Sequence, residues 1–127
     1  MSRIQTMCAA LVVMASGIEQ AAADSDIAFS FAECAGRFSA EMEHAWLLND
    51  PAANAFEQDR ASFVSLTDAS LAPGQGRAIL SHRIEVKLAH AALLQQSSFG
   101  TRPDRATMAR RVADQHLSTC RTLLLGS

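Results

Sequence analysis

The sequence has 127 residues, a length that suits a single domain. Its 11 basic and 13 acidic side chains give a formal net charge of −2, which is too close to neutral to indicate a partner such as nucleic acid or anionic lipid. We find no alternation of apolar and polar residues of the kind that β-strands show, and no internal repeat. These properties favour one all-α domain that does not bind nucleic acid.

The first 23 residues have the organisation of a secretory signal peptide. Arg3 provides a short positive region, residues 7–16 form an apolar core, and Ala21, Ala22 and Ala23 provide a small-residue cleavage site. The core is too short to span a bilayer, which needs about 20 apolar residues in a helix. We therefore predict a cleavable signal peptide at 1–23 and a mature domain at 24–127, periplasmic or secreted and without a stable membrane anchor. An uncleaved anchor or a buried core helix is the alternative.

Cleavage would remove Cys8 and leave two cysteines, Cys34 and Cys120, in the mature chain. Two cysteines in a small exported domain indicate one disulfide. The chain has no CxxC motif, so a thioredoxin-type redox pair is not expected. A bridge that closes so long a loop contributes about 4 kcal/mol in the chain-entropy treatment.

The stretch 26–49 carries the longest helical pattern. It has two apolar faces, which indicates a helix that is buried on two sides. The first face consists of Ile27, Phe31, Cys34, Phe38, Met42 and Ala45, and the second of Phe29, Ala32, Gly36, Ala40 and Leu47. The small residues of the second face would allow another backbone to approach closely, unless they are there only as residues that cost a helix little.

Three further helices are predicted. The second covers about 51–70, with Asp50 as its cap and Pro51 in its first position. A break with Pro73, Gly74 and Gly76 separates it from the third helix, at about 77–97, and the fourth ends near residue 125. The expected core residues are Ala52, Phe56, Phe63, Leu66 and Thr67 in the second helix, Leu80, Ile84, Leu88 and Ala91 in the third, and Ala106, Ala109, Ala113, Leu117, Cys120 and Leu124 in the fourth.

Four helices with short connections predict an up-down-up-down bundle. In that topology the first and last helices are antiparallel neighbours, so the beginning of one lies beside the end of the other. Cys34 lies near the beginning of the first helix and Cys120 near the end of the last, and both are on core faces. We therefore expect a disulfide between these two helices. An alternative arrangement places the first helix at the centre, with the other three around it.

Motifs for catalysis are absent: the sequence has no GxSxG, no phosphate-binding loop and no HExxH. Glu41 and His44 form one Glu-x-x-His pair, whereas a di-iron bundle needs two pairs and further glutamates. His116 borders the predicted core. We predict no catalytic residue, no cofactor and no metal site; Glu41, His44 and His116 are the nearest candidates for metal ligands.

The apolar residues that a lone bundle need not bury suggest self-association. They lie on the second stripes of the first and third helices: Phe29, Gly36, Leu47, Ile79, Val86 and Leu93. The favoured hypothesis is a non-catalytic binding or self-associating structural module, with a second copy or another periplasmic protein as partner. The alternative is a bundle that binds a ligand or a metal between its helices. An enzyme is a third hypothesis, for which the sequence indicates no reaction.

Overall fold

The computed structural model describes the backbone of residues 16–126 and the side chains of residues 26–126. This range contains four helices and no strand: α1 (Ser16–Leu47), α2 (Ala53–Ser70), α3 (Gly76–Phe99) and α4 (Pro103–Gly126). None of these helices is long and apolar enough to cross a membrane. Most of the predicted signal peptide, including Cys8, lies outside the described residues.

The first helix begins earlier than predicted. The helical pattern was expected at 26–49, but α1 extends back to Ser16. The intervening segment has no proline and is rich in alanine, so nothing in it interrupts the helix. The α1 backbone therefore passes without a break through the predicted cleavage site at 21–23.

The connection between α1 and α2 contains two local signals. Asn49 has a φ of 56°, and the N–H groups of Asn49 and Asp50 donate to the carbonyls of Trp46 and Ala45. This is the Schellman pattern that ends helices, here with asparagine in the left-handed position. The Asp50 carboxylate accepts a hydrogen bond of 2.9 Å from the N–H of Ala52. The predicted start of α2, with Asp50 as its cap and Pro51 in its first position, is nevertheless wrong by two residues, because the helix begins at Ala53 and its N-cap is Ala52.

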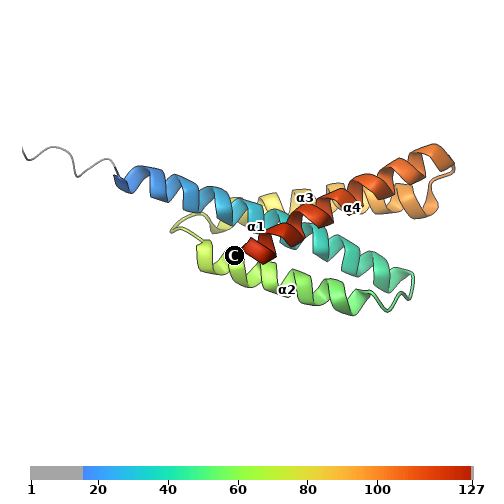
Figure 1. Cartoon of the computed structure of the whole chain (residues 1–127), viewed down its shortest axis with the longest axis horizontal. Helices are drawn as coiled ribbons and strands as arrows, with labels where there is room; N and C mark the ends of the chain where they lie inside the picture. Colours follow the sequence, from blue (N-terminus) through green and yellow to red (C-terminus); the bar gives the residue numbers. More distant parts are fainter. Residues whose placement is uncertain (1–15, 127) are drawn as a thin grey trace, which may run out of the picture.

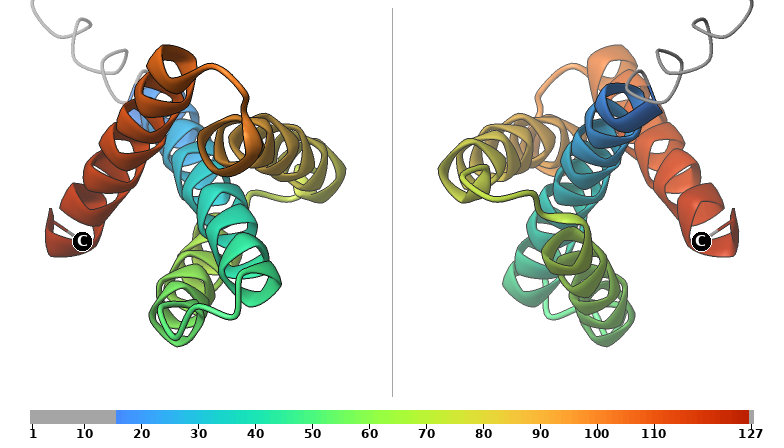
Figure 2. Two further views of the ribbon diagram at one scale, coloured as in Figure 1. Left: turned by 90° about the vertical axis from the view of Figure 1, so that its right-hand side faces the viewer. Right: turned by 90° about the vertical axis from the view of Figure 1, so that its left-hand side faces the viewer.

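Helix α1 is the centre of the fold. Its residues take part in all three apolar clusters of the described chain: one with α2 and α4, one with α3, and one with α3 and α4. The end-on views show the other three helices arranged around it (Figure 2). The described chain thus has the arrangement with a central first helix, and α2 meets α4 only through side chains.

The two-sided burial of α1 is confirmed. Phe31, Cys34 and Phe38 pack against Phe63 of α2 and Leu117 of α4, while Ala32 and Ala40 are buried on the α3 side. Between those two alanines, a β-carbon on Gly36 would lie only 2.5 Å from the carbonyl oxygen of Arg83. The small residues therefore do allow the α3 backbone to approach closely. The prediction of burial is wrong at the ends of the two apolar faces, where Ile27 and Leu47 are exposed.

The predicted core face of α3 is wrong. Leu80, Ile84 and Leu88 are 54, 48 and 63% exposed, whereas Ile79, from the second stripe, is 5% exposed. Both faces of α3 are apolar, so its own pattern does not show which one is buried. The small-residue face of α1 determines which face of α3 is buried, because only the stripe that contains Ile79 lies against it.

The predicted disulfide is present. Cys34 and Cys120 join α1 to α4, with their Cα atoms 5.6 Å apart, and both are buried. Since α1 and α4 touch along only a short stretch where they cross (Figure 1), the bridge fixes the C-terminal half of α4 on the core.

Candidate functional site

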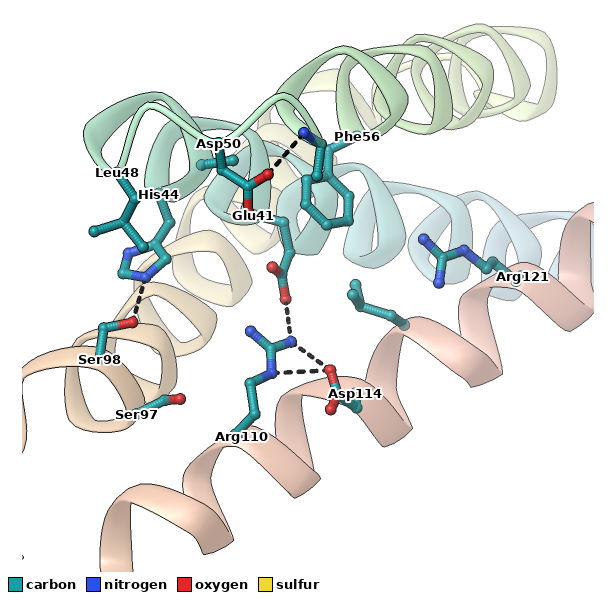
Figure 3. Close-up of a pocket in the computed structure, with 13 residues that line it drawn as sticks. Glu41, His44, Leu48, Asp50, Phe56, Ser97, Ser98, Arg110, Asp114 and Arg121 are labelled. Carbon is teal, nitrogen blue, oxygen red and sulfur yellow. Dashed lines mark hydrogen bonds and ion pairs between the residues drawn. The ribbon is translucent and has the colours of Figure 1, made fainter. Parts of the chain in front are cut away.

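A hollow of about 310 Å³ lies between two helical hairpins. The α1–α2 hairpin and the α3–α4 hairpin diverge toward their turns (Figure 1), and the hollow, called the notch below, opens between them. Its floor and rim are formed by Glu41, His44, Ala45, Leu48, Asp50, Ala52, Phe56, Ser97, Ser98, Arg110, Asp114, Leu117 and Arg121 (Figure 3). The notch thus combines both signs of charge, two hydroxyl groups and an apolar part.

A chain of ion pairs crosses the floor. Arg110 of α4 donates from Nη2 to Glu41 Oε1 of α1 at 2.9 Å, and from Nη2 and Nε to Asp114 Oδ1 at 2.6 and 2.9 Å (Figure 3). The Glu41 side chain is almost fully buried, whereas Asp114 lies on the surface. The guanidinium group therefore links a buried carboxylate to an exposed one.

The electrostatics follow from these contacts. Burial acts to raise the pKa of Glu41, but hydrogen bonds from His90 and Arg110 outweigh it, so the pKa lies below the ordinary value of 4.5. Burial likewise opposes the charge of Arg110, while its bonds to Glu41 and Asp114 raise its pKa. The pair is thus ionised at neutral pH.

The same carboxylate oxygen holds a histidine. His90 of α3 is fully buried, and its Nε2 lies 2.9 Å from Glu41 Oε1. Its other ring nitrogen, Nδ1, is the one buried side-chain nitrogen or oxygen among residues 26–126 without a hydrogen-bond partner. The nearest described ring is that of His116 on α4, whose centre lies 6.1 Å from the centre of the His90 ring.

Two further contacts shape the rim. His44 Nε2 and Ser98 Oγ are 2.7 Å apart, which ties the end of α1 to the end of α3 (Figure 3). On the opposite side, Arg121 extends from α4 and pairs with Asp59 of α2 at 3.4 Å. Both contacts are exposed, so a ligand could replace them at little cost.

The structure separates the predicted metal candidates. Glu41 is on the floor of the notch, His44 is on its rim, and His116 lies next to His90. Within the described part of the chain, no group of three or more histidine, cysteine, aspartate or glutamate side chains is placed to hold a metal ion. The sequence reasoning missed Arg110 as part of a site, and it did not foresee that His90, which lies beside the stripe of Ile79 and Val86, would contact Glu41.

Most of the predicted interface residues contact other residues of the same chain. Phe29 and Ile79 belong to one cluster between α1 and α3, Gly36 lies at the close approach of these helices, and Leu93 packs against a cluster that includes α4. Val86 is half-buried, and only Leu47 is largely exposed. Contact between α1 and α3 accounts for the apolar character of Phe29, Gly36 and Ile79. The prediction that it binds a second copy stays a prediction.

Comparison with known proteins gives no relative: no protein-family model matches the sequence, and no curated protein and no solved structure matches the chain.

Proposed function

We propose that this chain is an exported, disulfide-locked helical domain, with an up-down-up-down order of helices, that binds a small ligand in the notch rather than catalysing a reaction. The observation that supports this most is the notch itself: a hollow of about 310 Å³ with paired charges on its floor. Pockets in bundles lie between helices, where a few polar groups orient a ligand against apolar walls.

The side chains suggest the class of ligand. Arg110, Arg121 and Asp114 offer charged donors and acceptors, while Leu48 and Phe56 offer apolar surface. A small molecule with both a polar, ionised end and an apolar body matches this lining. Because the ion pairs already neutralise one another, a ligand of high net charge would be a poorer match.

The proposed export has two supports. The sequence begins with the pattern of a signal peptide, and the chain holds a disulfide, a bond that persists in oxidising compartments. Analysis of the N-terminus of the protein recovered from cells tests this. A chain that begins near Asp24 is expected, and a chain that still begins at Met1 would contradict it.

Binding can be tested with a panel of small carboxylates, alkylammonium ions and amino acids. We expect at least one probe to shift the amide resonances of Glu41, Ser97 and Arg110, which line the notch. Ser97→Phe should fill the notch and abolish the response. Ser65→Phe, on the exposed side of α2, should not. If no probe binds, or if Ser97→Phe binds as wild type does, the proposal is wrong.

Self-association is a second candidate, favoured by the stripe of Leu80, Ile84 and Leu88. Three large apolar side chains at four-residue spacing form one continuous exposed ridge on α3. Sedimentation at high protein concentration should then show a dimer, and Leu88→Glu should return it to a monomer. A wild-type protein that stays monomeric would exclude this candidate.

A further inference from the structure

We propose that the ligand of the notch is a monocarboxylate with a short apolar body, and that its carboxylate takes the place of Asp114 on the guanidinium group of Arg110. This class of ligand presupposes the binding function proposed above. Three features of the structure support it: the weak hold of Asp114 on Arg110, the fixed position of Arg110, and the charged and apolar groups in the rest of the lining.

Asp114 binds Arg110 with only one of its carboxylate oxygens. Its Oδ1 accepts from both Nε and Nη2, at 2.9 and 2.6 Å, and Oδ2 has no hydrogen bond to a described residue. The Asp114 side chain is mostly exposed and lies one turn from Arg110 on the same helix, and such pairs contribute little to stability. A carboxylate that is not tethered to α4 can place both oxygens on the same Nε and Nη2 edge, which is the stronger, bidentate arrangement.

Arg110 stays in position when Asp114 leaves it. Its Nη2 also donates to Glu41 of α1 at 2.9 Å, and the Glu41 side chain is almost fully buried (Figure 3). The exchange of one carboxylate for another on the exposed edge leaves this buried ion pair intact. A guanidinium group that is already held by a buried partner loses little freedom when a ligand binds, so more of the interaction energy contributes to affinity.

The rest of the lining suits the body of such a ligand. Leu117 and Arg121 follow Asp114 along α4, and Phe56 and Leu48 of the α1–α2 hairpin add apolar surface across the notch. The volume of about 310 Å³ is at the lower end of the range for ligand pockets, about 300–1,000 Å³. A short alkyl chain or a single ring therefore fits, attached to one carboxylate.

A ligand with an ammonium group is the competing class, and the lining suits it less well. The Glu41 carboxylate is buried in its contacts with α3 and α4, and the Asp50 carboxylate accepts from the N–H of Ala52. Of the carboxylates in the lining, this leaves Asp114, on the exposed rim. Arg121, by contrast, has N–H groups to spare, because its ion pair with α2 uses only Nη2.

Three probes with the same tail and different head groups test the proposal: hexanoate, hexanamide and hexylammonium. Each is titrated at pH 7 and followed by the amide resonances of Glu41, Ser97 and Arg110. We expect hexanoate to bind at least about tenfold more tightly than the other two. Asp114→Ala removes the competing carboxylate, so it should tighten the binding of hexanoate by about two- to fivefold and weaken that of hexylammonium. Arg110→Lys keeps a positive charge beside Glu41 but lacks the planar edge, and it should weaken hexanoate binding by about tenfold.

Asp104→Ala is the matched control. Asp104 is also an exposed aspartate of α4 that pairs with an arginine, Arg102, but it does not line the notch. Its removal changes the net charge equally and should leave the affinity for hexanoate unchanged.

The proposal is overturned if hexanoate binds no more tightly than hexanamide, if Asp114→Ala fails to tighten its binding, if Arg110→Lys binds it as wild type does, or if Asp104→Ala tightens it equally. In each of these cases, a probe whose binding Ser97→Phe abolishes still supports the notch as a binding site. If no probe binds there, the class of ligand and the binding function are both wrong.

Discussion

Gly36 of α1 and Arg83 of α3 are in backbone contact: a β-carbon on Gly36 would lie 2.5 Å from the carbonyl oxygen of Arg83 and 3.2 Å from the nitrogen of Lys87. The obstacle is backbone, which cannot rotate away as a flexible side chain can. Any larger residue must therefore push the two helices apart. Ala32 and Ala40 of α1 would then lose their packing against Ile79 and Leu94 of α3.

The first prediction concerns this contact. Gly36→Ala should lower the free energy of unfolding by about 1–3 kcal/mol, the usual cost of overpacking, despite the better helix propensity of alanine. Gly76→Ala is the matched control, since a β-carbon there meets nothing within 4 Å, and it should be neutral or slightly stabilising. Urea denaturation of the two variants measures both effects. Equal stability of Gly36→Ala and wild type would mean that α1 and α3 are farther apart.

The second prediction concerns the bridge between Cys34 and Cys120. The double variant Cys34→Ala/Cys120→Ala should unfold with a free energy lower by up to about 4 kcal/mol, because the unfolded chain regains the freedom of a long loop. Thermal unfolding with and without a reducing agent measures it. Reductant should lower the midpoint of wild type and leave the double variant unchanged. A reductant effect of the same size in both would show that the bridge contributes nothing.

The sequence was sufficient for several parts of the fold. Helix number, the break around Gly74 and the disulfide follow from local signals: capping residues, turn residues and cysteine positions on core faces. The close approach at Gly36 was also foreseeable, because three small residues recur one turn apart. What local signals do not contain is which neighbour each face meets, and this is where the predictions for α3 failed.

The candidate site was less predictable for the same reason. Glu41 was noticed for its pairing with His44 along one helix, but in the structure its partners are His90 and Arg110, which are far away in sequence. On a helical wheel Arg110 belongs to the exposed side of α4. It reaches Glu41 because α4 crosses α1 at an angle, and no periodicity within α4 encodes that crossing.

The third prediction is a pH dependence that comes from Glu41. Its pKa is lowered in the folded chain, so its ion pair and hydrogen bonds stabilise the fold above the unfolded value of about 4.5 and are lost as the pH falls below it. Glu41→Gln should therefore be less stable than wild type at pH 7, and the gap should narrow toward pH 3. Urea midpoints across this range test it. Glu57→Gln, on the exposed side of α2, should show no gap, and a constant gap for Glu41→Gln would contradict the prediction.

The fourth prediction tests which face of α3 is buried. Ile79 is enclosed between α3 and the alanines of α1, so Ile79→Ala should cost about 2–5 kcal/mol through lost burial and the cavity that remains. Leu88 is a similarly large residue on the same helix but is mostly exposed, so Leu88→Ala should change stability by less than about 0.5 kcal/mol in the monomer. Denaturation at low concentration, where self-association cannot contribute, compares the two. If Leu88→Ala proved the more damaging, α3 would present to the core the face that its sequence first suggested, and the contact between Gly36 and Arg83 could not exist as described.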